Sequence, residues 1–151
     1  MPPTVRAATP ADAATVVEFN RRLALETEGK TLDLPTLTAG VAAVLADPAR
    51  GRYYLAEADG AALAQLMITT EWSDWRNGWF WWIQSVYVRE DARRCGLFRL
   101  LYDQVHAEAR RDGSVIGLRL YVERDNRPAQ HTYRQLGMDA TDYLLLERCP
   151  L

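Results

Sequence analysis

Hydrophobic and polar residues in the first half of the chain follow first a helical and then a strand-like period. After a short strand before Thr9, apolar residues from Val16 to Leu23 recur at helical spacing and predict an amphipathic helix. Residues 35–48 predict a second helix, which ends at an Asp-Pro pair. Two strand-like runs then flank Asp59-Gly60, a dipeptide typical of a two-residue hairpin turn.

Long apolar runs separated by helical patterns dominate the second half. The run WFWWIQSVYV, residues 79–88, is too continuously apolar to have one face in water, so it predicts a central strand covered on both sides. A helix, a buried strand, a last helix and a closing strand are expected after it. Their respective ranges are about 97–112, 114–122, 128–137 and 138–148.

The element order is therefore β-α-α-β-β-β-α-β-α-β, and the fold class is α/β (α+β). The 151 residues, 48% of them hydrophobic, suit a single domain over residues 1–151. No apolar run reaches the roughly 20 residues that cross a bilayer, and the N-terminus lacks the pattern of a secretory signal. We therefore expect a soluble cytoplasmic protein without a membrane partner.

Charge and cysteine content argue against several kinds of chemistry. The net charge is −2, whereas a protein that binds nucleic acid needs a clustered basic face. The two cysteines, Cys95 and Cys149, form no CxxC pair, and the chain has two histidines. Neither a disulfide framework nor a zinc site is indicated. We expect no nucleic-acid partner and no metal.

The stretch RRCGLF, from Arg93 to Phe98, lies where the long apolar strand is followed by a helix. The start of a helix leaves backbone N–H groups unpaired, and the helix dipole adds a positive partial charge there. Gly96 lets a ligand approach the backbone, and Arg93 and Arg94 add donors suited to phosphate. The stretch has neither the GK[ST] of a Walker loop nor the GxGxxG of a dinucleotide fold. It therefore indicates a site for another phosphorylated ligand.

Two motifs resemble a known family. VYVREDARRCGLFRLLY is similar to the acyl-CoA-binding motif of the GNAT N-acetyltransferase superfamily, a strand followed by [QR]xxGx[GA] and a helix. LYVERDNRPAQHTYRQLGM resembles the second motif of the same family, in which an Asn begins a helix that ends in YxxLGF. The matching residues of the second motif are Asn126, Tyr133, Leu136, Gly137 and Met138. With the element order, the resemblance covers essentially the whole chain.

The resemblance implies a twisted mixed β-sheet with helices on both faces, and acetyl-CoA in a cleft between two splayed strands. The turn would bind the pyrophosphate, and the preceding strand would hold the pantetheine arm. Phe98 departs from the motif at its last small position, and we expect its ring to pack into the buried face of the helix. The residues implied in cofactor binding are Val86, Tyr87, Val88, Arg93, Arg94, Cys95, Gly96, Leu97, Phe98, Asn126 and Tyr133.

Tyr133 matches the tyrosine that protonates the departing thiolate in the family. Because Ala129, Tyr133 and Leu136 lie at helical spacing, it is also a candidate core residue, but we favour the acid role. No histidine is close in sequence to Cys95, so a cysteine nucleophile is not favoured. Direct attack by the amine is the simpler mechanism.

The general base is less clearly marked. Many relatives place a glutamate on the central strand, where this chain has Gln84 and Ser85, and neither takes a proton at neutral pH. Glu71 and Glu26 are the candidate bases, acting through water or holding an ammonium by charge. The residues expected to bind the acceptor are Glu26, Glu28, Glu71, Trp72, Asp74 and Gln84.

We therefore predict an acyl-CoA-dependent N-acetyltransferase that moves an acetyl group from acetyl-CoA to a small primary amine in a ternary complex. Acidic loops favour a cationic acceptor. Two alternatives stay open: transfer of a longer acyl group, and a domain that binds acetyl-CoA as a sensor without catalysis. The tryptophans from Trp72 to Trp82 either wall the acceptor site or pack, and a homodimer is an expectation from the resemblance.

Overall fold

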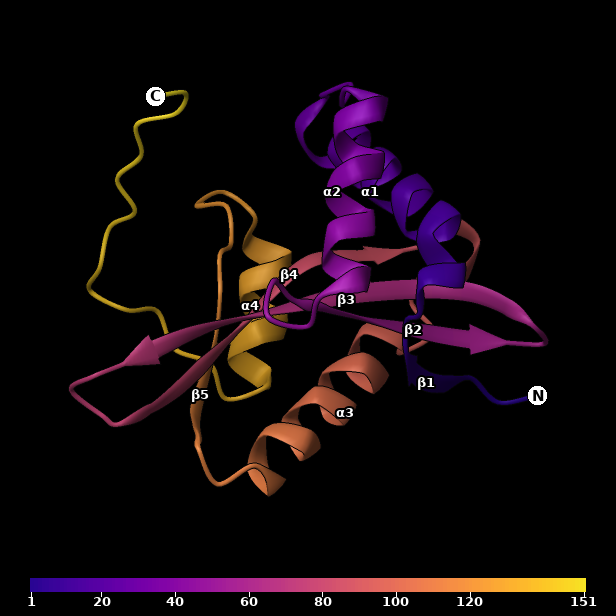
Figure 1. The fold of residues 1–151 in the computed structure, drawn as a ribbon. Coiled ribbons are helices and arrows are strands. Elements are labelled where there is room, and N and C mark those ends of the chain that lie inside the picture. Colours follow the sequence, from indigo (N-terminus) through magenta and orange to yellow (C-terminus); the bar gives the residue numbers. More distant parts are fainter. The chain divides into compact units, whose positions relative to one another are not determined.

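The computed structural model describes all 151 residues. They form two compact units, Met1–Leu120 and Tyr121–Leu151. The first unit contains the sheet and three of the four long helices, and the second contains the fourth (Figure 1).

The first unit is built on a mixed five-stranded sheet with the strands in chain order. Its strands are β1 (Thr4–Ala7), β2 (Arg52–Ala58), β3 (Ala61–Ser73), β4 (Gly78–Val88) and β5 (Val115–Leu120). β1 to β4 pair antiparallel, and β5 runs parallel to β4. Asp59 and Gly60, between β2 and β3, have φ angles of 51° and 77°, the positive values that a two-residue type I′ turn requires. The predicted hairpin is confirmed.

Helices cover both faces of this sheet, as the fold class requires. They are α1 (Ala13–Glu28), α2 (Leu34–Ala46) and α3 (Leu97–Arg111). α1 and α2 lie on one face and α3 on the other (Figure 1). The Asp33 side chain caps α2 by accepting a hydrogen bond from the amide of Thr36 (3.1 Å), and Gly29, with φ 62°, ends α1.

Each face of the sheet has its own apolar layer. The layer under α1 and α2 is centred on Val16, Val41, Tyr53 and Leu55. On the other face α3 buries Leu101 and Val105, and the hydroxyl of Tyr54 on β2 donates to Glu108 of α3 (2.5 Å). Both α1 and α3 contact β4. The prediction that the apolar strand is covered on both sides is therefore confirmed.

The second unit contains α4 (Arg127–Gln135) and no strand. The predicted closing strand over residues 138–148 is wrong, because a strand forms only by pairing with a neighbour and this segment joins no ladder. Its apolar side chains stay exposed, with exposed fractions of 75% for Tyr143, 77% for Leu144, 68% for Leu145 and 88% for Leu146. In neither unit is any helix long and apolar enough to span a membrane.

Candidate functional site

A β-bulge interrupts the second half of β4. Gln65 of β3 pairs with Tyr87 and Met67 pairs with Gln84, so Ser85 and the residue after it both stand opposite a single residue of β3. Ser85 has a φ of 51°, and its carbonyl accepts a hydrogen bond from Nε2 of Gln65 (3.0 Å). A bulge of this kind bends the strand and redirects its backbone groups.

At the bulge, β4 also extends beyond the end of its partner β5. The last pair of the parallel ladder joins Ile83 to Leu120, whereas β4 continues to Val88. β3 pairs with one edge of this extension, and within the first unit no strand pairs with the other edge. Unpaired backbone N–H and C=O groups on such an edge can bond a ligand. The expected pantetheine contacts, Val86 to Val88, all lie on this extension.

The stretch from Arg93 to Gly96 connects β4, through a 3-10 turn at Glu90–Ala92, to α3. Arg94 and Gly96 have φ angles of 63° and 74°, and Gly96 precedes the helix with no side-chain cap. Left-handed residues of this kind turn backbone N–H groups toward a common concavity that favours anions. A Cβ on Gly96 would meet no atom within 4 Å, so the backbone conformation, and not space, favours glycine here. Beside the first amides of α3, the turn fits a pyrophosphate.

The two arginines of this turn have different surroundings. Arg93 forms an ion pair with Glu26 of α1, and its Nε donates to the carbonyl of Val88 (3.0 Å). Its guanidinium carbon also lies 5.8 Å from the ring centre of Tyr87. Arg94 is exposed and has no hydrogen bond or ion pair. Arg93 therefore ties the turn to α1 and β4, and Arg94 is the arginine whose donors remain for a phosphate.

The other residues of the turn lie at the start of α3. Leu97 begins the helix, as the sequence predicts, and is buried. The ring of Phe98 is half-buried, and its centre lies 6.3 Å from that of Tyr102, one helical turn further on. The ring therefore lies beside the buried face of α3 and is not fully packed into it. Cys95 is exposed, with its Sγ 3.5 Å from the carbonyl of Arg93.

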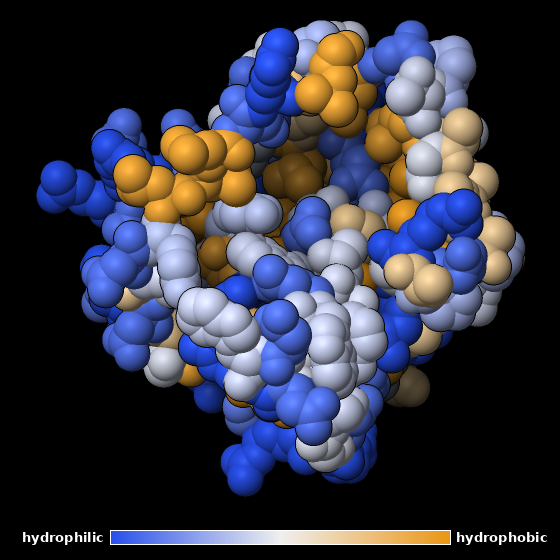
Figure 2. Space-filling view, turned by 60° about the vertical axis from the view of Figure 1, so that its left-hand side comes forward, coloured by the Kyte–Doolittle hydropathy of each residue, from blue (hydrophilic) through white to orange (hydrophobic).

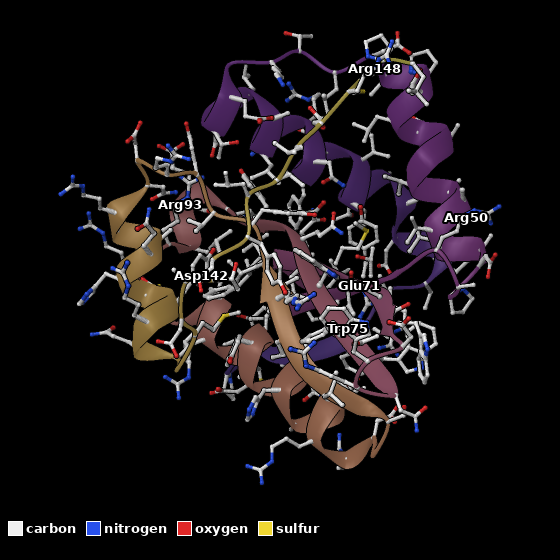
Figure 3. The ribbon with its side chains drawn as sticks, turned by 90° about the vertical axis from the view of Figure 1, so that its left-hand side faces the viewer. Arg50, Glu71, Trp75, Arg93, Asp142 and Arg148 are labelled. Atoms are coloured by element: carbon white, nitrogen blue, oxygen red, sulfur yellow. The ribbon has the colours of Figure 1, made fainter.

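The structure does not bring the two candidate bases together. Glu26 lies beside Tyr87, whose hydroxyl donates to Oε1 of the carboxylate (3.5 Å). Glu71 pairs with Phe80 across β3 and β4. The strand between Phe80 and Tyr87 covers about 20 Å. Figure 3 correspondingly shows Glu71 well apart from Arg93, the partner of Glu26. At most one of these carboxylates can act at a single reaction centre.

Glu71 belongs to a charged and aromatic patch that the sequence did not reveal. Its Oε1 accepts hydrogen bonds from Nη1 of Arg119 (2.8 Å) and Nε1 of Trp82 (3.1 Å). The guanidinium carbon of Arg119 lies 3.5 Å from the ring centre of Phe80. Arg119 lies on β5, and its only signal in the sequence was a charge inside the apolar run SVIGLRLYV. Both candidate bases are thus held in ion pairs.

Gln84 lies on the same sheet face as Glu71, but Trp72 does not. Nε2 of Gln84 donates to Oγ1 of Thr69 (2.6 Å), and Thr69 precedes Glu71 by two residues on β3. Trp72 follows Glu71 directly and therefore points to the other face, where its ring centre lies 4.9 Å from that of Trp79. The structure does not place Trp72 as a wall beside Glu71.

Asp74 and Glu28 make local contacts. Asp74, in the turn after β3, accepts a hydrogen bond from the amide of Trp75 (2.9 Å). Glu28 ends α1, and its carboxylate lies 4.0 Å from Nζ of Lys30. Neither contact indicates a role beyond the loop that contains it.

A buried polar cluster lies beside the bulge and was missed in the sequence. Nδ2 of Asn20 donates to the hydroxyl of Tyr53 (3.1 Å), and Nε2 of Gln65 lies 3.4 Å from Oδ1 of Asn20. Gln65 is fully buried, and its Oε1 has no hydrogen-bond partner. Burial raises the pKa of Tyr53, so its hydroxyl stays protonated. Through the Gln65–Ser85 hydrogen bond, this cluster connects α1 to the bulge. A glutamine inside the apolar run ALAQLMI was the available signal.

In the second unit, Asn126 and Tyr133 lie on the predicted helix. Asn126 begins α4, and its side chain accepts a hydrogen bond from the amide of Ala129 (3.2 Å), which confirms that an Asn starts this helix. Tyr133 is half-buried, and burial raises the pKa of its phenol. Gly137, with φ 87°, follows the helix. The roles of Asn126 and Tyr133 toward acetyl-CoA stay predictions.

Several solved structures share this fold. A possible acetyltransferase from Clostridium difficile 630 is 44% identical, covers 99% of this chain and 98% of its own, and superposes with a TM-score of 0.93. A predicted acetyltransferase from Clostridium acetobutylicum, solved with acetyl-CoA, is 21% identical over 97% of this chain and 96% of its own, with a TM-score of 0.79. A ribosomal-protein-alanine N-acetyltransferase from Brucella melitensis biovar Abortus 2308 is 17% identical over 97% and 98% of the two chains, with a TM-score of 0.79. The latter two show the fold alone.

The sequence model of the acetyltransferase (GNAT) family matches residues 19–138. This match and the 44% identity to the C. difficile protein show that the chain belongs to the GNAT acetyltransferase family. Among curated proteins, none matches the sequence. The predicted family and fold class are confirmed, and membership supports an acyl-transferring enzyme.

Proposed function

We propose that this protein is an N-acetyltransferase that moves the acetyl group of acetyl-CoA to a primary amine by direct attack. The observation that carries the proposal is the continuous succession of bulge, unpaired β4 edge and left-handed turn before α3. Each part provides backbone donors for one section of an acyl-CoA. The Clostridium acetobutylicum neighbour was solved with acetyl-CoA, which agrees with this use of the fold.

The chain divides the binding work between backbone and side chains. The first amides of α3 and the guanidinium of Arg94 bind the pyrophosphate, and the edge of β4 from Val86 to Val88 bonds the pantetheine arm. Acetyl-CoA, when bound, supplies the acetyl thioester. A backbone N–H near the bulge, aimed at the carbonyl oxygen, stabilises the charge that develops there, a contribution on the order of 10²-fold or more in rate.

Proton transfer is assigned to two side chains. Tyr133 donates a proton to the departing sulfur, and its raised pKa keeps the phenol protonated at neutral pH. Glu26 is the proposed base and acts on the ammonium through water, since its carboxylate already binds Arg93 and Tyr87. Glu71 lies too far along the sheet from Glu26 to share this task, so we assign it to binding of the acceptor.

A calorimetric titration with acetyl-CoA tests the cofactor site. We expect binding by the wild type and its loss in an Arg94→Ala, Gly96→Asp double variant. Arg110→Ala at the other end of α3 is the matched control and should bind normally. Failure of the wild type to bind acetyl-CoA would refute the proposal.

Release of CoA with a panel of amines then separates the enzyme from a sensor. Amine-dependent release supports the transferase. Binding without release for every amine and acyl length would favour the alternative, an acetyl-CoA-binding regulatory domain. Comparing acetyl-, propionyl- and longer acyl-CoA donors tests the second alternative, transfer of a longer acyl group.

We also propose a homodimer. Four consecutive exposed apolar residues, Tyr143 to Leu146, are unusual on a monomer and favour an interface, and Trp75 is 88% exposed. Figure 2 shows apolar side chains gathered in several places between hydrophilic ones. Light scattering should give a dimer for the wild type and for Glu147→Gln, and a monomer for a Leu144→Asp, Leu146→Asp double variant. A monomeric wild type would refute this.

A single domain over residues 1–151 and a cytoplasmic location stay predictions. The family match extends across Leu120, the last residue of the first unit, and so supports one functional domain.

A further inference from the structure

Four residues from three strands form a patch on the sheet face that carries α1 and α2. They are Glu71 on β3, Phe80 and Trp82 on β4, and Arg119 on β5, and we call them the Arg119 patch. The ladder pairs Glu71 with Phe80 and Trp82 with Arg119, so their side chains point to one side. Met67 and its partner Gln84 lie further along the same face, and Met67 packs against the apolar layer under α1 and α2.

The patch holds its charges in place but leaves donors and acceptors for a ligand. Arg119 lies against the ring of Phe80, which fixes the plane of its guanidinium. Its only hydrogen bond runs from Nη1 to Oε1 of Glu71, so Nε and Nη2 have no partner. Oε2 of Glu71 has no partner either, since Trp82 also donates to Oε1. The side chains of Arg119 and Glu71 are 25% and 48% exposed, so solvent reaches both.

These free atoms match two ligand groups of opposite charge. Two free donors in a planar guanidinium suit a carboxylate, and a free carboxylate oxygen suits an ammonium. A group with both charges close together can meet both side chains without breaking the Glu71–Arg119 ion pair. An α-amino acid end has this composition.

The distance between the Arg119 patch and the bulge matches the length of a short acceptor molecule. The strand from Trp82 to Ser85 covers about 10 Å, and the strand from Phe80 to Ser85 about 16 Å. An extended lysine has roughly 7–8 Å between its carboxylate and its side-chain nitrogen. With contacts of about 3 Å at each end, it spans this interval.

We infer that the Arg119 patch binds the α-amino acid end of the acceptor, whose second, distal amine reaches the bulge and takes the acetyl group. The inference rests on the proposed function and names the acceptor class, a diamino acid of about lysine length. The carboxylate binds Nε and Nη2 of Arg119, and the α-ammonium binds Oε2 of Glu71. The neutral distal amine attacks the thioester carbonyl, its proton leaves to solvent through Glu26, and the sulfur receives a proton from Tyr133.

Four amines of similar length test this assignment by the kcat/KM for CoA release. L-lysine has both charged groups, cadaverine lacks the carboxylate, 6-aminohexanoate lacks the α-ammonium, and pentylamine lacks both. We expect lysine to be the best acceptor and pentylamine the poorest. Loss of the charge-assisted bonds to the carboxylate should lower kcat/KM by about 10- to 100-fold between lysine and cadaverine.

Two variants test which side chain causes each difference in kcat/KM between the amines. Arg119→Gln should bring lysine down to the level of cadaverine while changing cadaverine less than about 3-fold. Glu71→Gln should lower the kcat/KM of lysine to the level of 6-aminohexanoate, which lacks the α-ammonium. Arg50→Gln removes another arginine of an exposed ion pair, with Asp47, and should leave the kcat/KM of all four amines unchanged.

Equal values for lysine and cadaverine in the wild type, or an equal loss for all four amines in Arg119→Gln, would overturn the assignment. If no amine releases CoA, the proposed transferase fails, and the patch is tested by lysine binding to the CoA-bound protein. Calorimetric binding of lysine that Arg119→Gln abolishes would still support the patch. The absence of such binding would overturn it.

Discussion

Gly96→Ala isolates the backbone geometry of the pyrophosphate turn. Gly96 has a φ of 74°, and a Cβ there meets no atom within 4 Å, so the substitution adds conformational strain without a steric clash. A left-handed conformation costs a non-glycine residue about 1–2 kcal/mol. For a chain of this size that lowers the Tm by about 2–8 °C. The strained turn should also lose one charge-assisted hydrogen bond to the phosphate, which weakens acetyl-CoA binding by about 10-fold or more.

Two other glycines are matched controls for this variant. Gly60 in the β2–β3 hairpin has a φ of 77° and equally open space, so Gly60→Ala should lower the Tm as much while leaving acetyl-CoA affinity unchanged. Gly113 has no positive φ and no close neighbour, so Gly113→Ala should change neither. Calorimetric affinity and thermal melts of the three variants give the comparison. Equal affinity for Gly96→Ala and Gly60→Ala would refute the assignment of the turn.

Three further predictions follow from the described contacts. Tyr133→Phe should lower kcat by about 10²-fold or more and leave acetyl-CoA affinity nearly unchanged, because it removes the acid but not the ring; an unimpaired kcat would remove this role. Glu26→Gln should flatten the acid limb of the pH–rate profile and release Arg93 from its ion pair; an unchanged profile would mean that solvent deprotonates the amine. Arg6 lowers the pKa of Asp12 to about 2 through a hydrogen bond, so this carboxylate stabilises the fold above its unfolded pKa near 4 and loses that effect as the pH falls toward 2. The difference in free energy of unfolding between wild type and Arg6→Gln should therefore shrink across that window in urea titrations, and a constant difference would contradict this pairing.

Local signals were sufficient for most of the fold. The Asp59-Gly60 turn, the covered strand over residues 79–88 and the start of α3 at Leu97 each depend on neighbouring residues, and the structure has them all. The last strand failed because the apolar run from Tyr143 to Leu146 expresses only a preference, whereas a strand also has to pair with a neighbour, and residues 138–148 join no ladder. No local pattern states whether that neighbour is present.

The candidate site was predictable where it depends on backbone and not where it depends on distant partners. A strand, a glycine and a helix start identified the turn from Arg93 to Gly96. The ion pair between Glu71 and Arg119 joins residues 48 positions apart, and Gln65 meets Asn20 across 45 positions. Such pairings follow from the way strands, turns and helices pack in three dimensions, which no local stretch of the sequence specifies. For the same reason the sequence could not show that Arg93 is occupied by Glu26 while Arg94 is free.

The extra residue in β4 changes how positions along this strand must be counted. Before Ser85, the even-numbered residues Phe80, Trp82 and Gln84 face α1 and α2. After it, the odd-numbered Tyr87 faces them, with its ring centre 5.1 Å from that of Phe19 on α1. The bulge is a phase shift that puts the two halves of one strand out of step. Deleting one residue there would restore plain alternation and turn Tyr87 away from Glu26. The turn that connects β4 to α3 would then leave the strand toward the opposite face of the sheet.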